Sequence, residues 1–269
     1  MEGNINGNLV PVEELKNIIN SKNKMVYEVI RIIDTKPLFL NGHLERLYNS
    51  ISTLNINVPF SKEDISKYII NLSKVNNKSC GNIKLIIDSE TLDLGIYFIE
   101  HIYPTKDQYL KGVDVTLFNG ERHNPNAKII NSEFRKEVDV VLENNKAYEA
   151  ILVNNSGHIT EGSKSNIFMI KDNIVYTAPV ESVLPGVTRK YIIDMIRELD
   201  YKLIEKYITV DELLSMDSMF ICGTSPKILP IHKVDQVIFN SNKDLNILKL
   251  IYEFDKVIKK DIAEFNISI

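Results

Sequence analysis

One lysine and one glutamate stand in surroundings that suit covalent chemistry on a carbonyl compound. Lys128 lies in the run HNPNAKIINSEF, just after a proline-containing loop and just before the apolar pair Ile129-Ile130. Contact with apolar surface lowers the pKa of a lysine and favours a nucleophilic amine. Glu161 lies in ITEG, ahead of a glycine where the chain must turn sharply. A carboxylate at such a strand end can point inward and hold a protonated ring nitrogen.

Two loops and one arginine have the composition of phosphate-binding groups. Gly186-Val187-Thr188 precede a helix expected to start near Arg189, so backbone N–H groups and the threonine hydroxyl can bind an anion. Gly223-Thr224-Ser225 follow the strand-like run DSMFIC and offer the same chemistry from a second loop. Arg46 shares a helix face with His43, and a guanidinium can bind phosphate through a bidentate fork.

Together these groups match the requirements of pyridoxal phosphate. That cofactor needs an amine for a Schiff base, an anionic partner for its ring nitrogen and donors for its phosphate. Each residue alone has an ordinary structural interpretation: a loop lysine, a turn glutamate, a capped helix without a ligand, or a surface ion-pair arginine. The combination therefore favours a cofactor site where no single residue would.

Composition excludes several other classes of protein. The chain has 269 residues, a net charge of −4 and no block of basic residues, which argues against a nucleic-acid partner. No apolar stretch reaches the roughly 18 residues that span a bilayer, and the first residues are not arranged as a signal peptide. Cys80 and Cys222 lie far apart and lack His or Cys at metal-ligand spacing. We expect a cytoplasmic protein with no metal site and no membrane partner.

Hydrophobic periodicity predicts the elements that must position these residues. Helices are predicted over 43–54, 61–75 with Ser61 as N-cap, 132–146, 189–199 and 245–265. Strands are predicted over 25–33, in a hairpin of 83–87 with 95–102, in a meander of 148–154, 165–170 and 174–178, and near Leu203 and Phe220. This α+β pattern predicts a small N-terminal α/β domain over residues 1–118, an interdomain loop over 119–127 and a larger β-rich domain over 128–269.

Seven motifs in order resemble those of the class IV aminotransferases, which share pyridoxal phosphate fold type IV. They run from about Met25 to Pro230 and read YEVIRI, HLERL, NAKIIN, YEAILVN, ITEGSKSNIF, LPGVTRKYII and FICGTSPKILP. That family includes D-amino acid and branched-chain aminotransferases and aminodeoxychorismate lyases. The resemblance implies a small α/β domain, a larger pseudo-barrel domain, a cofactor between them and a homodimer.

The resemblance also implies roles for individual residues. Lys128 would form the Schiff base and Glu161 would pair with the pyridine nitrogen, so these two are the predicted catalytic residues. Tyr27 would line the substrate side, and Leu184 would pack against the cofactor ring. The residues implied to hold the phosphate are Arg46, Val187, Thr188 and Thr224.

The region that selects the substrate departs from the family's pattern. D-Amino acid aminotransferases carry an Arg and a His near the second strand of the small-domain hairpin. Here that stretch reads IKLIIDSETLDLGIYF, with Lys84 as its basic residue, and His101 follows without an arginine beside it. Backbone N–H groups of Thr224-Ser225 are the nearest candidates for the substrate carboxylate, with Arg122 and Arg31 as possible helpers. We therefore expect an L-amino acid to be a better donor than D-alanine.

The leading hypothesis is an amino-acid aminotransferase with a ping-pong cycle, whose partners are an amino acid and a 2-oxo acid. Lys128 would act as general base and acid between Cα and the cofactor. A lyase of the aminodeoxychorismate type would use the same lysine, and dependence of turnover on a keto acid separates the two. A dimer that binds the cofactor without catalysis is the second alternative, and the presence of both Lys128 and Glu161 argues against it.

Overall fold

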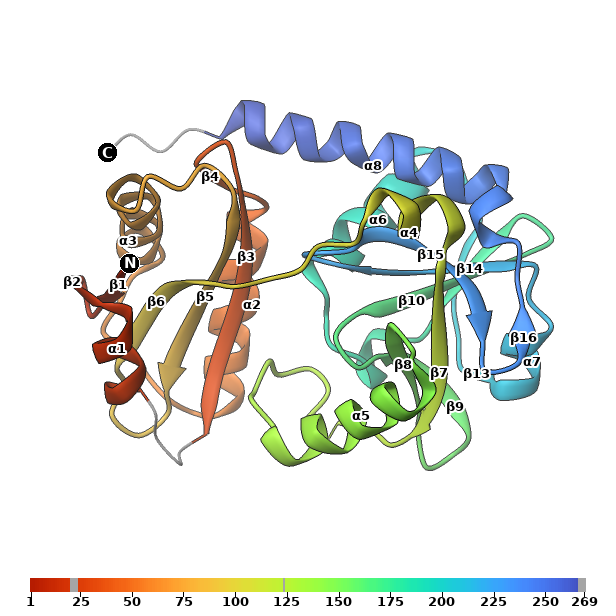
Figure 1. Ribbon diagram of the computed structural model, residues 1–269, viewed down its shortest axis with the longest axis horizontal. Coiled ribbons are helices and arrows are strands. Elements are labelled where there is room, and N and C mark those ends of the chain that lie inside the picture. The colour runs from red at the N-terminus through yellow and green to blue at the C-terminus, as the bar shows by residue number, and fades with distance from the viewer. Residues whose placement is uncertain (20–23, 123, 266–269) are drawn as a thin grey trace. The chain divides into compact units, whose positions relative to one another are not determined.

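The computed structural model describes residues 1–19, 24–122 and 124–265, which form two compact units (Figure 1). Unit 1 comprises Met1–Ile102, Ala127–Ile130 and Ile258–Ile269, and unit 2 comprises Tyr103–Asn126 and Asn131–Val257. Each unit has its own β-sheet. Within the described ranges, no helix is long and apolar enough to cross a membrane.

The sheet of unit 1 has six strands in the order β2-β1-β6-β5-β3-β4, and neighbouring strands run antiparallel. The predicted hairpin is confirmed as β5 and β6, and the predicted first strand is β3. The strands are β1 (Glu2–Ile5), β2 (Asn8–Pro11), β3 (Met25–Ile33), β4 (Lys36–Pro37), β5 (Gly81–Asp88) and β6 (Leu94–Ile99). The helices are α1 (Val12–Ile18), α2 (Leu40–Thr53) and α3 (Lys62–Val75).

The two faces of this sheet pack against different helices. Leu47 of α2 and Ile69 of α3 belong to one apolar core, and Leu15 of α1 belongs to another. Successive side chains of a strand point to opposite faces, so β3 contributes to both. Glu28 faces α2, whereas Tyr27 packs with the core that contains α1. Neighbouring residues of one strand therefore reach different surroundings.

Unit 2 contains a ten-stranded sheet that curls on itself (Figure 1). Its order is β12-β11-β10-β14-β15-β7-β8-β9-β13, with β16 paired to β15. The strands are β7 (Val113–Asn119), β8 (Glu149–Val153), β9 (His158–Gly162), β10 (Asn166–Lys171), β11 (Ile174–Thr177), β12 (Leu203–Glu205), β13 (Ile208–Thr209), β14 (Ser218–Gly223), β15 (Lys227–Val234) and β16 (Val237–Ile238). The helical elements are α4 (Lys106–Lys111), α5 (Ser132–Asn145), η1 (Val180–Ser182), α6 (Val187–Glu198), α7 (Val210–Leu214), η2 (Ser241–Lys243) and α8 (Leu245–Glu264), whose residues from Ile258 onward belong to unit 1.

The predicted meander is wrong at one step. β10 pairs with β11, as expected, but β8 pairs with β9, a strand that the predicted meander did not include, and not with β10. β9 and β10, however, are not neighbours, because β9 pairs with β13 and β10 pairs with β14. The connecting residues Ser163 and Ser165 bind the carboxylate of Glu149 instead of closing a hairpin turn. Side-chain hydrogen bonds thus redirect the chain between two strands that are close in sequence.

The compact units differ from the division expected at residues 118 and 127. β7, expected in the N-terminal domain, forms parallel pairs with β8 and β15 inside unit 2. Residues 127–130 cluster with unit 1, because Tyr27 N–H donates to Lys128 C=O and Ile130 N–H donates to Met25 C=O, each at 3.0 Å. Ladder hydrogen bonds, which a change in composition does not reveal, decide both assignments.

The capping box at the start of α3 allows a test of local stability. Ser61 Oγ accepts the Asp64 N–H at 3.1 Å, and the Asp64 carboxylate accepts the Ser61 N–H at 3.0 Å. Ser61→Ala should lower the free energy of unfolding by about 1 kcal/mol, because an N–H of the first turn loses its acceptor. Urea unfolding followed by circular dichroism measures the change. Ser61→Asn keeps an acceptor and serves as control; an equal loss in both variants would contradict the prediction.

Candidate active site

Lys128 is held by its main chain at the edge of the unit 1 sheet. Its C=O accepts the Tyr27 N–H of β3, and its N–H donates to Ser50 Oγ of α2 at 3.1 Å. Its Nζ lies 4.6 Å from the centroid of the Tyr27 ring. The backbone of the predicted Schiff-base lysine is therefore fixed, and its amine lies over an aromatic ring. Tyr27, predicted on the substrate side, is brought next to Lys128.

Lys84 is a second amine near the same ring, and the sequence did not mark it as a site residue. Its Nζ lies 5.6 Å from the Tyr27 ring centroid. Burial lowers the pKa of the Lys84 ammonium, and the charge of Lys128 lowers it further, against an opposing effect of Tyr27. In the described part of the chain, no carboxylate forms an ion pair with Lys84. A half-buried ammonium of this kind can pair with an anionic group of a ligand.

Arg46 lies in a buried cluster with Glu28 and His43. Its Nε donates to Glu28 Oε1 and its Nη2 donates to Glu28 Oε2, both at 2.7 Å, while His43 Nδ1 lies 2.8 Å from Oε2. Burial by itself would raise the pKa of Glu28, but the charge of Arg46 and the hydrogen bonds from Arg46 and His43 hold it well below its usual range. Burial lowers the pKa of His43. The predicted phosphate-binding arginine is thus held in one orientation by a bidentate pair.

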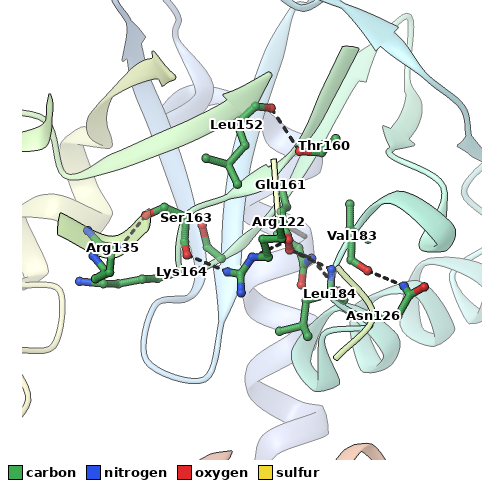
Figure 2. A network of polar contacts seen from close by, with 12 residues as sticks. Arg122, Asn126, Arg135, Leu152, Thr160, Glu161, Ser163, Lys164, Val183 and Leu184 are labelled. Carbon is green, nitrogen blue, oxygen red and sulfur yellow. Dashed lines mark hydrogen bonds and ion pairs between the residues drawn. The ribbon is translucent and has the colours of Figure 1, made fainter. Parts of the chain in front are cut away.

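Glu161 is buried at the end of β9 and is held through both oxygens (Figure 2). Its Oε1 forms an ion pair with Arg122 Nε at 2.9 Å, without the geometry of a hydrogen bond. Its Oε2 accepts the Leu184 N–H at 3.1 Å and the Asn166 side-chain amide at 3.3 Å. A buried carboxylate is costly unless charges and donors compensate it, and these groups provide that compensation. Arg122, considered from the sequence as a helper for substrate, lies instead against a predicted catalytic residue.

Asn166 connects several predicted site residues, although the sequence did not single it out. Its side-chain amide donates hydrogen bonds to Glu161 Oε2 and, at 3.1 Å, to Leu184 C=O. A Cβ at Gly186 would lie 2.0 Å from Asn166 Oδ1, so glycine allows this close approach. Asn166 also pairs with Cys222 in register, at the end of β14. The feature of the sequence that could have marked Asn166 as a site residue is its position at the end of ITEGSKSN, where a strand begins.

The first turn of α6 and the turn after β14 contain the remaining predicted phosphate ligands. α6 begins two residues earlier than expected, so Val187 and Thr188 lie in its first turn, and no side chain caps it. Uncapped N–H groups at a helix N-terminus favour an anion. Thr224 and Ser225 lie in the turn between Gly223 and Lys227, which pair across β14 and β15. Because Asn166 pairs with Cys222, this turn lies at the same sheet end as Asn166.

The loop that follows Glu161 is shaped by another buried glutamate, Glu149. Its Oε1 accepts the Ser163 hydroxyl at 2.6 Å, and its Oε2 accepts the Lys164 N–H at 3.1 Å and the Ser165 hydroxyl at 2.9 Å. A Cβ at Gly162 would lie 2.1 Å from Ser165 Oγ, so only glycine fits beside this arrangement. The residues of EGSKS therefore match specific contacts of the loop that ends β9.

The structure groups the predicted site residues into two sets. Unit 1 contains Tyr27, Arg46 and Lys128, and Tyr27 lies beside Lys128. In unit 2, Glu161 and Leu184 are in direct contact. The other predicted residues of unit 2 are Gly186, Val187, Thr188, Thr224 and Ser225.

Comparison with known proteins gives concordant findings. The sequence model of the family described as amino-transferase class IV matches residues 25–234. A putative branched-chain-amino-acid aminotransferase of Methanocaldococcus jannaschii is 29% identical over 251 residues, covering 87% of this chain and 86% of the relative. A D-alanine aminotransferase of Bacillus licheniformis is 28% identical over 223 residues, covering 78% of each chain. The crystal structure of the Escherichia coli branched-chain amino acid aminotransferase has a TM-score of 0.87 at 22% identity, covering 97% of this chain and 95% of that chain, which confirms the predicted fold class.

The Glu28 cluster predicts a strong effect of removing Arg46. Arg46→Met should lower the free energy of unfolding by roughly 3 to 5 kcal/mol, because Glu28 would remain buried without its main compensating charge. Glu28→Gln combined with Arg46→Met should recover part of that loss. Urea unfolding measures both variants near neutral pH. At that pH the depressed pKa of Glu28 contributes fully to stability, since this contribution disappears only as pH falls through the folded-state pKa.

Arg197→Met is the matched control for this prediction. Arg197 is exposed and lies 3.7 Å from Glu205, so its loss should change stability by less than about 0.5 kcal/mol. If Arg46→Met were as mild as this control, Glu28 would not depend on Arg46.

Proposed function

Because the chain belongs to the class IV aminotransferase family, we propose that it moves an amino group from an L-amino acid to a 2-oxo acid in two successive half-reactions. The family match confirms the resemblance predicted from the motifs between Met25 and Pro230. The observation that best supports the proposal is the buried Glu161 carboxylate, held through both oxygens. A fixed carboxylate is what a protonated ring nitrogen needs as a partner.

Pyridoxal phosphate is the cofactor of this family, and when bound it withdraws electrons from the substrate Cα. The chain carries a donor set that fits this group. Lys128 supplies an amine, Glu161 a buried carboxylate, and the first turn of α6 an anion site with no side-chain cap. Arg46, held by Glu28, supplies a charged donor for the phosphate.

Each residue has a distinct proposed role. The Lys128 amine would hold the cofactor through its carbonyl carbon and, when free, would move a proton from the substrate Cα to that carbon as general base and then acid. Glu161 keeps a proton on the ring nitrogen. Leu184 packs against the ring, and its N–H helps to hold Glu161. The residues proposed to hold the phosphate are Arg46, Gly186, Val187, Thr188 and Thr224.

The substrate carboxylate requires a cationic or N–H-rich partner. Thr224 and Ser225 offer backbone N–H groups in their turn, as the sequence suggested. Lys84 adds a half-buried ammonium beside Tyr27, the residue proposed for the substrate side. Arg122 is not assigned this role, because its Nε lies against Glu161.

We also propose that the enzyme is a homodimer in the cytoplasm. The dimer is carried over from the class IV resemblance. The absence of a disulfide between the exposed Cys80 and the buried Cys222 supports the proposed cytoplasmic location. Analytical ultracentrifugation of the purified chain measures the assembly state directly.

Borohydride trapping tests the cofactor assignment. The purified protein with pyridoxal phosphate should be yellow, and reduction should attach the cofactor permanently to the peptide that contains Lys128. Mass spectrometry of a digest locates the modification. Lys84→Met keeps Lys128 and should still be labelled there, whereas labelling of another lysine in the unmodified chain would end the assignment.

A panel of amino donors tests the substrate proposal. At least one L-amino acid should convert the cofactor absorbance faster than D-alanine, because the hairpin lacks the Arg and His of the D-amino acid enzymes. Stopped-flow absorbance measures each half-reaction without an acceptor. The prediction is contradicted if D-alanine reacts faster than every L-amino acid tested. Steady turnover that needs no 2-oxo acid would favour the lyase reaction over transamination.

A further inference from the structure

We infer that Arg122 is a positioning residue, which holds Glu161 ionised and correctly oriented for the ring nitrogen of the cofactor. This inference rests on the proposed function, because it concerns the role of Glu161 in that reaction. Arg122 forms an ion pair with one oxygen of the Glu161 carboxylate, and its Nε lies 2.9 Å from Oε1 (Figure 2).

Arg122 also binds the main chain just beyond Glu161. Its Nη2 donates to Ser163 C=O at 2.8 Å. The Arg122 side chain is 17% exposed and that of Glu161 is 3% exposed, so the contact is largely screened from water. An ion pair in such surroundings is less weakened by solvent than a surface pair. One guanidinium thus contacts both the carboxylate and the backbone two residues later.

The segment that carries Arg122 is itself attached at both ends. Gly120 N–H donates to Val153 C=O of β8 at 2.9 Å. At the other end, the Asn126 amide donates to Val183 C=O at 2.8 Å (Figure 2). It also donates to Val180 C=O at 2.7 Å. These bonds do not involve Glu161. The position of Arg122 is therefore supported independently of the carboxylate that it contacts, as a positioning role requires.

The second oxygen of Glu161 has neutral partners. Oε2 accepts the Leu184 N–H and the Asn166 amide, so within this set Arg122 supplies the positive charge. Loss of that charge shifts a carboxylate buried this deeply toward taking up a proton or turning toward water. Either change removes an ionised acceptor from the place where Glu161 is proposed to hold the ring N–H. Loss of Arg122 should therefore weaken cofactor binding only when residue 161 is a glutamate.

Arg135 provides a matched control in the same network. Its Nη1 donates to Ser163 Oγ at 2.9 Å, and its Nε donates to Asp139 at 2.9 Å. Like Arg122, it places a guanidinium against Ser163, but it makes no contact with Glu161. A variant at Arg135 therefore changes the network without touching the proposed target of Arg122.

A double-mutant cycle tests the inference. The full chain, freed of cofactor, is titrated with pyridoxal phosphate as wild type, Arg122→Gln, Glu161→Gln and the double variant. Arg122→Gln should weaken binding about 10- to 100-fold when residue 161 is Glu, the range of a bond to a charged group. With Gln at 161, the same change should weaken binding less than about 2-fold, because contacting residues are not additive. Arg135→Gln should have the same small effect in both backgrounds.

Urea unfolding of the cofactor-free variants gives a second readout. Coupling between residues 122 and 161 should appear there too, because the ion pair exists without the cofactor. Arg122→Lys, which keeps the charge, should recover most of the affinity lost in Arg122→Gln. If Arg122→Gln does not fold, Arg122→Met, which also removes the charge, replaces it in the cycle.

The outcomes separate the inference from the function on which it rests. Equal weakening by Arg122→Gln in both backgrounds, or no weakening in either, overturns the positioning role while leaving the cofactor assignment intact. Binding by Arg122→Lys as weak as that of Arg122→Gln shows that charge is not what Arg122 supplies, and also overturns it. Failure of wild type to bind pyridoxal phosphate refutes the proposed function itself, whereas normal binding and turnover in Glu161→Gln removes Glu161 as the ring-nitrogen partner and overturns the inference with it.

Discussion

The structure depends on how buried carboxylates are compensated. Glu28, Glu149 and Glu161 are each less than a twentieth exposed, at 0%, 4% and 2%. Burying a carboxylate costs several kcal/mol unless donors or cations replace its hydration. That cost is comparable to the whole free energy of unfolding of a domain. Each of these three glutamates therefore requires specific partners. The partners come from other helices, strands and loops than the glutamate's own, and they determine how those segments are arranged.

The three glutamates are compensated in different ways, with different consequences. Glu28 has a bidentate arginine and a histidine, so its pKa is strongly lowered and the arginine has a fixed orientation. Glu149 has neutral donors from the loop after β9, so its role is to shape that loop. Glu161 has an arginine on one oxygen and neutral donors on the other. That mixture leaves a charged carboxylate in a fixed place, which suits a partner that is itself cationic.

Strand alternation explains how one short motif contributes to two sites within unit 1. In YEVIR, Tyr27 packs on the face that carries Lys84, while Glu28 packs on the face of α2. Residues 127–130 then extend the sheet at β3 by main-chain bonds, which sets the Lys128 amine over the Tyr27 ring. Backbone hydrogen bonds thus fix the position of Lys128, and the Tyr27 ring provides the surface that its amine contacts.

The sequence by itself determined the elements whose signals are local. Periodicity and capping residues were sufficient for β3, for α3 with its Ser61 cap, for α5 and for the long α8, because neighbours along one helix or strand decide such patterns. The motifs also sufficed to identify the family and its candidate lysine and glutamate. Only the tertiary structure decided that β9 and β10 do not pair, that β7 belongs to unit 2 and that Arg122 lies against Glu161. These features rest on strand pairing and an ion pair between residues far apart along the chain, such as Val113 with Ile231 and Arg122 with Glu161, or on a loop bent by a buried carboxylate. No local pattern specifies which distant donor a buried acceptor will find, because that choice is made when the core closes around it.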